Sequence, residues 1–189
     1  MTERLRRLVE ADLDAEQLEI YRSITGGPRA SGTQVFQLQD AAGSLNGPFG
    51  VMLHAPHVGS PLEKLGSAIR YRTSLSDRER EIAILMVASA TDSEFERYAH
   101  ERVGRVAGLT EDELGVLRAG SYPQADQREA RVGELCARLL ADERITDDEF
   151  EAASAVLGNP TIIELVVLVG YYRTLAQLMD VFDVQAPAD

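Results

Sequence analysis

A repeated helix-start pattern is the feature that most constrains the fold of this chain. A Ser, Thr or Asp is followed three residues later by Glu or Gln, so that each side chain can accept a hydrogen bond from the other residue's backbone N–H. Apolar residues after these starts recur at intervals of three and four, as on one face of a helix. No comparable strand pattern recurs, and an all-α fold is predicted. The starts are Asp14, Ser60, Ser76, Ser93, Thr110 and Thr146.

These signals divide the chain into helices joined by short connections. Gly108 and Gly158 are expected to end two of them, because glycine readily adopts the left-handed conformation that closes helices. Asn159 and Pro160 are expected to open the last long helix, since proline suits the first helical turn. The predicted helices cover residues 2–10, 14–25, 60–73, 76–90, 93–107, 110–119, 124–141, 146–157 and 160–182.

The segment 26–59 is the exception, because it is rich in glycine and proline. This composition predicts turns, and a loop of this length in a compact domain is often functional. A short helix near 49–54 is expected inside it. With 189 residues, the chain is long enough for a single domain with its own core, which we expect to span 1–189.

Charge and cysteine content exclude several classes of function. A net charge of −12 argues against nucleic acid or an anionic membrane as partner, since both attract a basic surface. The apolar run 162–172 is interrupted by Glu164 and is too short to cross a bilayer. The N-terminus lacks the apolar stretch of a secretory signal, so a cytoplasmic protein is expected. The single cysteine, Cys136, excludes an internal disulfide, a CxxC pair and a cysteine-based zinc site.

The segment 82–90 is apolar on all sides, so it is expected to lie at the centre of the fold. Glu81 precedes it, and a carboxylate there is costly unless it is paired or near water. Two interpretations remain open. Glu81 either stabilises the positive end of the helix dipole or belongs to a functional site.

The helix predicted over 93–107 has two distinct faces. An apolar core face and an outer ladder of ion pairs account for most positions, and each surface pair contributes a few tenths of a kcal/mol. The core face holds Phe95, Ala99, Val103 and Val106; the ladder holds Glu94, Arg97, Glu101 and Arg105.

Glu96 and His100 belong to neither face. They are four residues apart at the border of the apolar stripe, where a pocket wall would lie. A carboxylate beside an imidazole raises the pKa of the histidine and allows proton exchange near neutral pH. Glu96 is also in position to complete a capping box with Ser93, so a purely structural role stays open. His54 and His57 lie in the loop, and the three histidines of the chain form no metal-binding pattern.

Three stretches together resemble the carboxymuconolactone decarboxylase family, which includes the alkylhydroperoxidase D-like proteins. They are LNGPFGVMLHAP, SLSDREREIAILMVASATDSEFERYAHERVGRVAGLTEDEL and IIELVVLVGYY. The resemblance covers 45–182 and leaves 1–44 as added N-terminal helices and loop. It implies an orthogonal bundle of eight or nine helices that forms homo-oligomers, trimers or hexamers, with sites near subunit contacts.

The redox branch of this family carries a Glu, a CxxC pair and a His, and the matching positions here are Glu81, Ser93, Glu96 and His100. Both cysteines are replaced, so no thiolate is available for peroxide chemistry at this place. The decarboxylase branch, with an acid at the second cysteine position, is closer. Its members remove CO2 from a lactone acid without metal or organic cofactor.

The resemblance therefore implies a cofactor-independent lyase acting on a small lactone or oxo-acid. His100 would be the acid/base, oriented by Glu96, with Glu81 as relay or binding carboxylate. Phe49, His54 and Tyr172 are candidate substrate-binding residues, with ordinary packing as their alternative role. A non-catalytic oligomeric binding or scaffold protein that has lost the redox cysteines is the second hypothesis. A peroxidase using Cys136 is the third.

Overall fold

The computed structural model describes residues 4–31 and 34–187, and regular structure in these residues is helical. The isolated antiparallel bridge between Gln39 and Leu45 is the one β contact within them. The prediction of an all-α fold is confirmed. The helices are Ala15–Thr25 (α1), Pro48–Met52 (α2), Pro56–Tyr71 (α3), Asp77–Ala90 (α4), Glu94–Val106 (α5), Glu111–Arg118 (α6), Gln127–Leu140 (α7), Asp147–Leu157 (α8) and Asn159–Val181 (α9), with 3-10 turns at Glu10–Asp12 (η1) and Pro28–Ala30 (η2).

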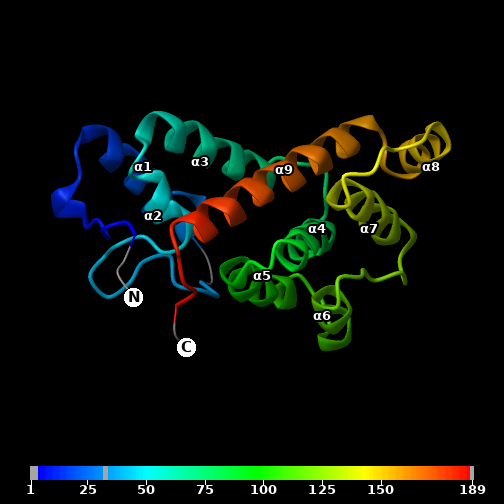
Figure 1. Cartoon of the computed structure of the whole chain (residues 1–189), viewed down its shortest axis with the longest axis horizontal. Helices are drawn as coiled ribbons and strands as arrows, with labels where there is room; N and C mark the ends of the chain where they lie inside the picture. The colour runs from blue at the N-terminus through cyan, green and yellow to red at the C-terminus, as the bar shows by residue number, and fades with distance from the viewer. Residues whose placement is uncertain (1–3, 32–33, 188–189) are drawn as a thin grey trace.

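Helix α4 lies at the centre of the fold and packs most extensively against α5, α7 and α9. Figure 1 shows α9 running along the molecule, with α1, α2 and α3 toward one end and α6, α7 and α8 toward the other. Every residue from Glu79 to Ala88 is buried, which confirms the central position predicted for this segment. Full burial of side chains such as Ile82, Ile84 and Val87 contributes about 1.5–3 kcal/mol each to the hydrophobic stabilisation of the fold.

Most of the predicted helix starts are confirmed. Complete capping boxes form at Asp14, Ser76, Thr110 and Thr146. Gly108 and Gly158 have φ values of 93° and 76°, so both adopt the left-handed conformation expected after a helix.

Two predicted capping boxes are wrong. Helix α3 begins at Pro56 rather than at Ser60, because Pro56 occupies the first helical turn and the helix continues through Pro61. Ser93 does precede α5, but its side chain makes no capping hydrogen bond. Its backbone N–H instead donates to the Ala88 carbonyl at 3.0 Å, in a tight turn where Asp92 has a φ of 50°.

The helix predicted over 2–10 is also wrong for its described residues, since only η1 forms near its end; residues 2 and 3 lie outside the described part of the chain. Tertiary contacts account for the difference. Arg7 donates to Asp40 at 2.9 Å and to Asn46 at 2.8 Å, which ties the segment to a distant part of the chain.

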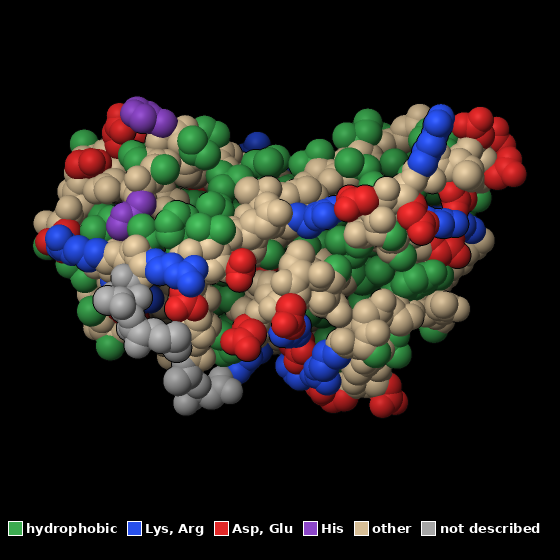
Figure 2. All heavy atoms as spheres, in the orientation of Figure 1, with side chains coloured by type: hydrophobic (Ala, Val, Ile, Leu, Met, Phe, Trp, Pro, Cys, Tyr) green, Lys and Arg blue, Asp and Glu red, His purple; other side chains and the backbone are tan. Residues whose placement is uncertain are grey.

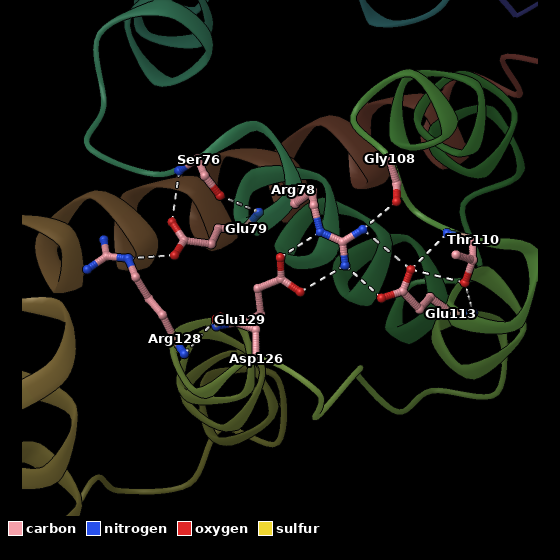
Figure 3. Close-up of polar contacts among 9 residues, drawn as sticks. All are labelled: Ser76, Arg78, Glu79, Gly108, Thr110, Glu113, Asp126, Arg128 and Glu129. Atoms are coloured by element: carbon pink, nitrogen blue, oxygen red, sulfur yellow. Dashed lines mark hydrogen bonds and ion pairs between the residues drawn. The ribbon is translucent and has the colours of Figure 1, made fainter.

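A polar network ties the first turn of α4 to α6 and α7 (Figure 3). Arg78 donates to the two carboxylate oxygens of Glu129 at 2.6 and 2.9 Å and to Glu113 at 2.6 Å. It also donates to the Gly108 carbonyl at the end of α5. The hydrogen bond from Arg78, together with those from Thr110, lowers the pKa of Glu113 to about 2.

Replacing Arg78 with methionine is expected to lower the free energy of unfolding by about 2–4 kcal/mol, because it leaves the buried Glu129 carboxylate without its cation. Urea denaturation of both proteins measures the difference. Arg72→Met is the matched control, since Arg72 is exposed, and it should change stability by less than about 0.5 kcal/mol. Equal stabilities of the two variants would show that the network contributes nothing.

Helix α9 is longer than the apolar run 162–172 within it. By length and composition it could cross a membrane, and half of the relevant window is buried inside the structure, as in a core helix. Its exposed apolar residues include Ile163 and Val166. Figure 2 shows acidic and basic side chains interspersed over the visible face rather than segregated by sign.

Candidate functional site

A cavity of about 190 Å³ lies between the N-terminal loop segment and helices α2, α3, α5 and α9. It is the hollow that brings together most of the residues singled out in the sequence. Glu96 and His100 line it from α5, Phe49 from α2 and Tyr172 from α9. Arg29, Arg70 and Tyr171 line the cavity as well.

His100 is held between two carboxylates. Its Nδ1 lies 2.7 Å from Oε2 of Glu81, and its Nε2 lies 3.3 Å from Oε2 of Glu96. All three side chains are buried, with relative exposures of 7% for His100, 0% for Glu81 and 2% for Glu96. The arrangement is a carboxylate–imidazole–carboxylate chain that reaches from the centre of α4 to the cavity wall.

This environment decides the protonation state of His100. Burial by itself lowers the pKa of the imidazole, but the charge of Glu81, the hydrogen bond to it and the hydrogen bond to Glu96 outweigh burial and raise the pKa to about 9. At neutral pH His100 is therefore an imidazolium that faces a cavity. Such a group can donate a proton and can take it back from water.

Glu81 lies beyond the first turn of α4, whose acids are Asp77 and Glu79, and it contacts His100; its role in a functional site stays a prediction. Its Oε2 contacts His100, and its Oε1 has no hydrogen-bond partner among the described residues. Arg70 lies 3.9 Å and Arg80 4.0 Å from that second oxygen, so two cations offset the charge of this buried carboxylate. The charge of Glu81 in turn raises the pKa of the Arg70 guanidinium, against the effect of burial.

The alternatives for Glu96 are also separated by the geometry. Because Ser93 makes no capping hydrogen bond, Glu96 does not complete a capping box. Its Oε2 faces His100, while its Oε1 is buried without a hydrogen-bond partner among the described residues. A carboxylate oxygen left unpaired in a cavity wall is costly to folding, and functional sites are where such groups occur.

Aromatic rings continue the wall beyond His100. The rings of His100 and Tyr172 meet edge to face with centroids 5.2 Å apart, and Tyr171 meets Tyr172 in the same way at 5.3 Å. Burial raises the pKa of both tyrosines, so both keep their hydroxyl protons.

His54 is placed outside this cavity. It is exposed, its Nε2 lies 3.0 Å from the Arg6 carbonyl oxygen, and it borders a separate hollow near the two ends of the chain. His57 is exposed as well and lies 3.7 Å from Glu16.

The predicted faces of α5 are partly confirmed. Phe95 and Ala99 are buried, but Val106 is 72% exposed because the helix ends at that residue. Of the predicted ladder, the Glu101–Arg105 pair forms at 3.5 Å, whereas Arg97 pairs with Asp92 instead.

Sequence reasoning missed the two arginines of the cavity. Arg70 comes from the end of α3 and Arg29 from η2, in a segment with no helical periodicity. The one available signal was a cation within the Gly/Pro-rich stretch GGPRASG.

Thiol or metal chemistry would depend on the cysteine and on the possible metal ligands among the described residues. Cys136 is fully buried on α7, and burial raises the pKa of its thiol to about 12. Within the described residues, no group of three His, Cys, Asp or Glu side chains is arranged to hold a metal ion.

Comparisons with known proteins support the family prediction. Residues 56–133 match the model of the carboxymuconolactone decarboxylase family, a shorter range than the predicted 45–182. No curated protein matches the sequence.

Solved structures extend the comparison to the fold. A peroxidase-related protein from Ralstonia eutropha, described as an alkylhydroperoxidase AhpD core, has a TM-score of 0.76 at 12% identity, covering 97% of this chain and 92% of that chain. A protein of unknown function from Agrobacterium tumefaciens, described as a candidate AhpD antioxidant defence protein, has a TM-score of 0.64 at 19% identity, covering 72% of this chain and 94% of that one. Residues 56–133 thus match the carboxymuconolactone decarboxylase family, and the chain has the alkylhydroperoxidase D-like fold.

Proposed function

We propose that this protein is a cofactor-independent carbon–carbon lyase that decarboxylates a small lactone acid or oxo-acid. The observation that carries the proposal is the imidazolium of His100, buried between Glu81 and Glu96 in the wall of a cavity. A cavity of about 190 Å³ suits a small substrate. The expected small-molecule partner, homo-oligomeric state and cytoplasmic location rest on the sequence and the family resemblance, and they stay part of the proposal.

The proposed reaction needs one proton at carbon. Breaking the bond between the substrate and its carboxylate releases CO2 and leaves the bonding electron pair on the substrate. A conjugated carbonyl takes up that pair as an enolate. His100 then supplies a proton to the carbon through Glu96 and recovers one from water.

The two carboxylates have different tasks in this scheme. Glu81 lies against Nδ1 and keeps the imidazolium charged and oriented. Glu96 lies against Nε2 and presents an unpaired oxygen at the cavity wall, where it can pass a proton between His100 and the substrate. Glu96 and His100 both line the cavity, so they are the proposed catalytic pair, and the fully buried Glu81 is the positioning residue.

A thiol peroxidase is not the function these residues support, although the names of the structural neighbours include peroxidase and antioxidant roles. The nucleophile of such an enzyme is an accessible thiolate. Ser93 and Glu96 stand at the two positions where the redox branch carries cysteine. Cys136 is buried away from the cavity and is protonated at neutral pH.

Replacing Glu96 with glutamine is expected to lower turnover of an accepted lactone acid by about 10²-fold, because the amide cannot relay a proton to the substrate. The assay is CO2 release from a panel of small unsaturated lactone acids and oxo-acids. Incorporation of solvent deuterium at the protonated carbon is followed by NMR. Glu94→Gln is the matched control, since Glu94 is exposed on the same helix and should leave both signals unchanged.

Two results would contradict the proposal. Full activity of Glu96→Gln on a substrate that the wild-type protein accepts would remove Glu96 from the mechanism. Binding of lactone acids by the wild-type protein without CO2 release or deuterium incorporation would favour the alternative, an oligomeric binding protein of the same fold.

A further inference from the structure

The cavity wall contains a charged group, Arg29, that the proposed chemistry does not use. Arg29 lies on η2, in the N-terminal segment that precedes the family-matched region, and its side chain is 12% exposed. Its guanidinium lies over the ring of Phe49, 5.1 Å from the ring centroid. A charged side chain from this turn thus lies largely out of water in the cavity wall, which is costly for a charge.

Side-chain hydrogen bonds hold the backbone around Arg29 in place. Gln34 donates from its side chain to the Arg29 carbonyl at 3.0 Å, and the Ser31 hydroxyl donates to the Pro28 carbonyl at 2.7 Å. These bonds fix the backbone on both sides of the residue. The guanidinium is therefore pre-positioned at the cavity, which lowers the entropy cost of binding a ligand there.

Gly66 of α3 leaves room for this guanidinium and for a tyrosine hydroxyl. A Cβ atom at Gly66 would lie 2.1 Å from the Tyr171 hydroxyl oxygen and 3.1 Å from Nη2 of Arg29. The two groups therefore meet above one position that has no side chain. Both are hydrogen-bond donors, and burial keeps the Tyr171 hydroxyl protonated by raising its pKa.

The Arg29 guanidinium does not have all its donors satisfied within the described residues. The nearest carboxylate to Arg29 is Glu63, whose Oε1 is 3.7 Å from Nε, an ion-pair distance too long for a hydrogen bond. Nε of Arg29 is buried and has no hydrogen-bond partner among the residues that the structure describes. A guanidinium carries five N–H donors in a planar arrangement that matches the two oxygens of a carboxylate. The N–H donors of Arg29 that Glu63 does not bind could therefore hydrogen-bond to an anionic ligand.

We propose that Arg29 and Tyr171 form an anion-binding subsite that selects ligands bearing a carboxylate. The subsite is separated from His100 along the wall by the Tyr171–Tyr172 and Tyr172–His100 ring contacts, so it holds one end of a ligand while His100 faces another part. Arg29 is the specificity-determining residue. Its role in turnover rests on the proposed function, whereas its role in binding does not.

The test is calorimetric binding of γ-butyrolactone-γ-carboxylate and of its neutral methyl ester. The wild-type protein is expected to bind the carboxylate at least about 10-fold tighter than the ester, as one charge-assisted hydrogen bond allows. Arg29→Gln should abolish this preference, and Tyr171→Phe should reduce it about 3-fold or more. Arg72→Gln is the matched control, since Arg72 is exposed and lies outside the cavity.

Glu63→Gln gives the sharpest result, because it separates a binding role from a structural one. Removing the competing carboxylate should tighten binding of the carboxylate ligand, the opposite of the effect of Arg29→Gln. If the Arg29–Glu63 pair only supported the fold, both variants would weaken binding of acid and ester alike. That outcome, or a carboxylate preference that survives in Arg29→Gln, would overturn the proposal.

The binding test is also independent of catalysis. A carboxylate preference that depends on Arg29 in a protein that never releases CO2 would leave the subsite standing and contradict the proposed lyase. CO2 release without a carboxylate preference in binding would support the proposed lyase and contradict the Arg29 subsite. Thermal melting of each variant shows that the compared proteins are folded.

Discussion

Replacing His100 with glutamine is expected to lower turnover by roughly 10²–10⁴-fold, the range associated with loss of a general acid/base. Glutamine is similar in size and keeps an N–H donor, but it cannot give up a proton. The measurement is kcat/KM for the best substrate of the lactone-acid panel. His57→Gln is the matched control, because that histidine is exposed and lies away from the cavity. Undiminished turnover in folded His100→Gln would remove the imidazolium from the mechanism.

The same residue predicts how activity depends on pH. With a pKa raised to about 9, His100 is in its acid form at neutral pH, and activity should fall as pH rises through about 9. The stability contribution has the same sign. It is complete below the ordinary histidine value of 6.5, declines as pH rises, and is lost above about 9. At pH 10, about one unit above the expected midpoint, kcat/KM should already be reduced. A profile that stays flat to pH 10 would contradict the role of the His100 imidazolium as the acid.

Replacing Gly47 with alanine is expected to lower the free energy of unfolding by about 3–5 kcal/mol, from backbone strain and overpacking together. Gly47 has φ 62° and ψ −147°, a conformation that is essentially restricted to glycine. A Cβ atom there would also lie 2.2 Å from the ring of Phe95, which lines the cavity. Urea or thermal denaturation measures the loss.

Gly115→Ala is the matched control for that substitution. Gly115 lies inside α6, and a Cβ atom there would meet no other atom within 4 Å. It is expected to raise stability by about 0.5–1 kcal/mol, because glycine is unfavourable within a helix. A mild effect of Gly47→Ala, similar in size to that of the control, would show that the Pro48 turn can rearrange.

Local sequence explains why most of the fold was predictable. A capping box involves residues three apart, and an amphipathic helix needs only its own periodicity, so α1, α4, α6 and α8 could be placed from the chain alone. The errors occur where distant residues decide. Arg7 is bound by Asp40 and Asn46, and Ser93 lies in a turn closed by its hydrogen bond to the Ala88 carbonyl.

The candidate site likewise contains one part that local sequence predicts and one part that depends on distant residues. Glu96 and His100 are four residues apart on one helix, so their proximity follows from helical geometry alone. Glu81 is 19 residues from His100, and the family spacing, rather than any local rule, placed the two in one cluster.

The sequence by itself determined an all-helical chain, a buried central helix and a Glu–His pair at its neighbour's border. Only the tertiary structure decided that Glu96 faces His100 instead of capping its helix. It also decided that Arg29 and Arg70 line the same cavity as this pair. The physical reason is the distance along the sequence over which each kind of interaction acts. Helix signals act over one or two turns, whereas burial, ion pairing and the pKa of a buried histidine depend on which distant side chains exclude water around it.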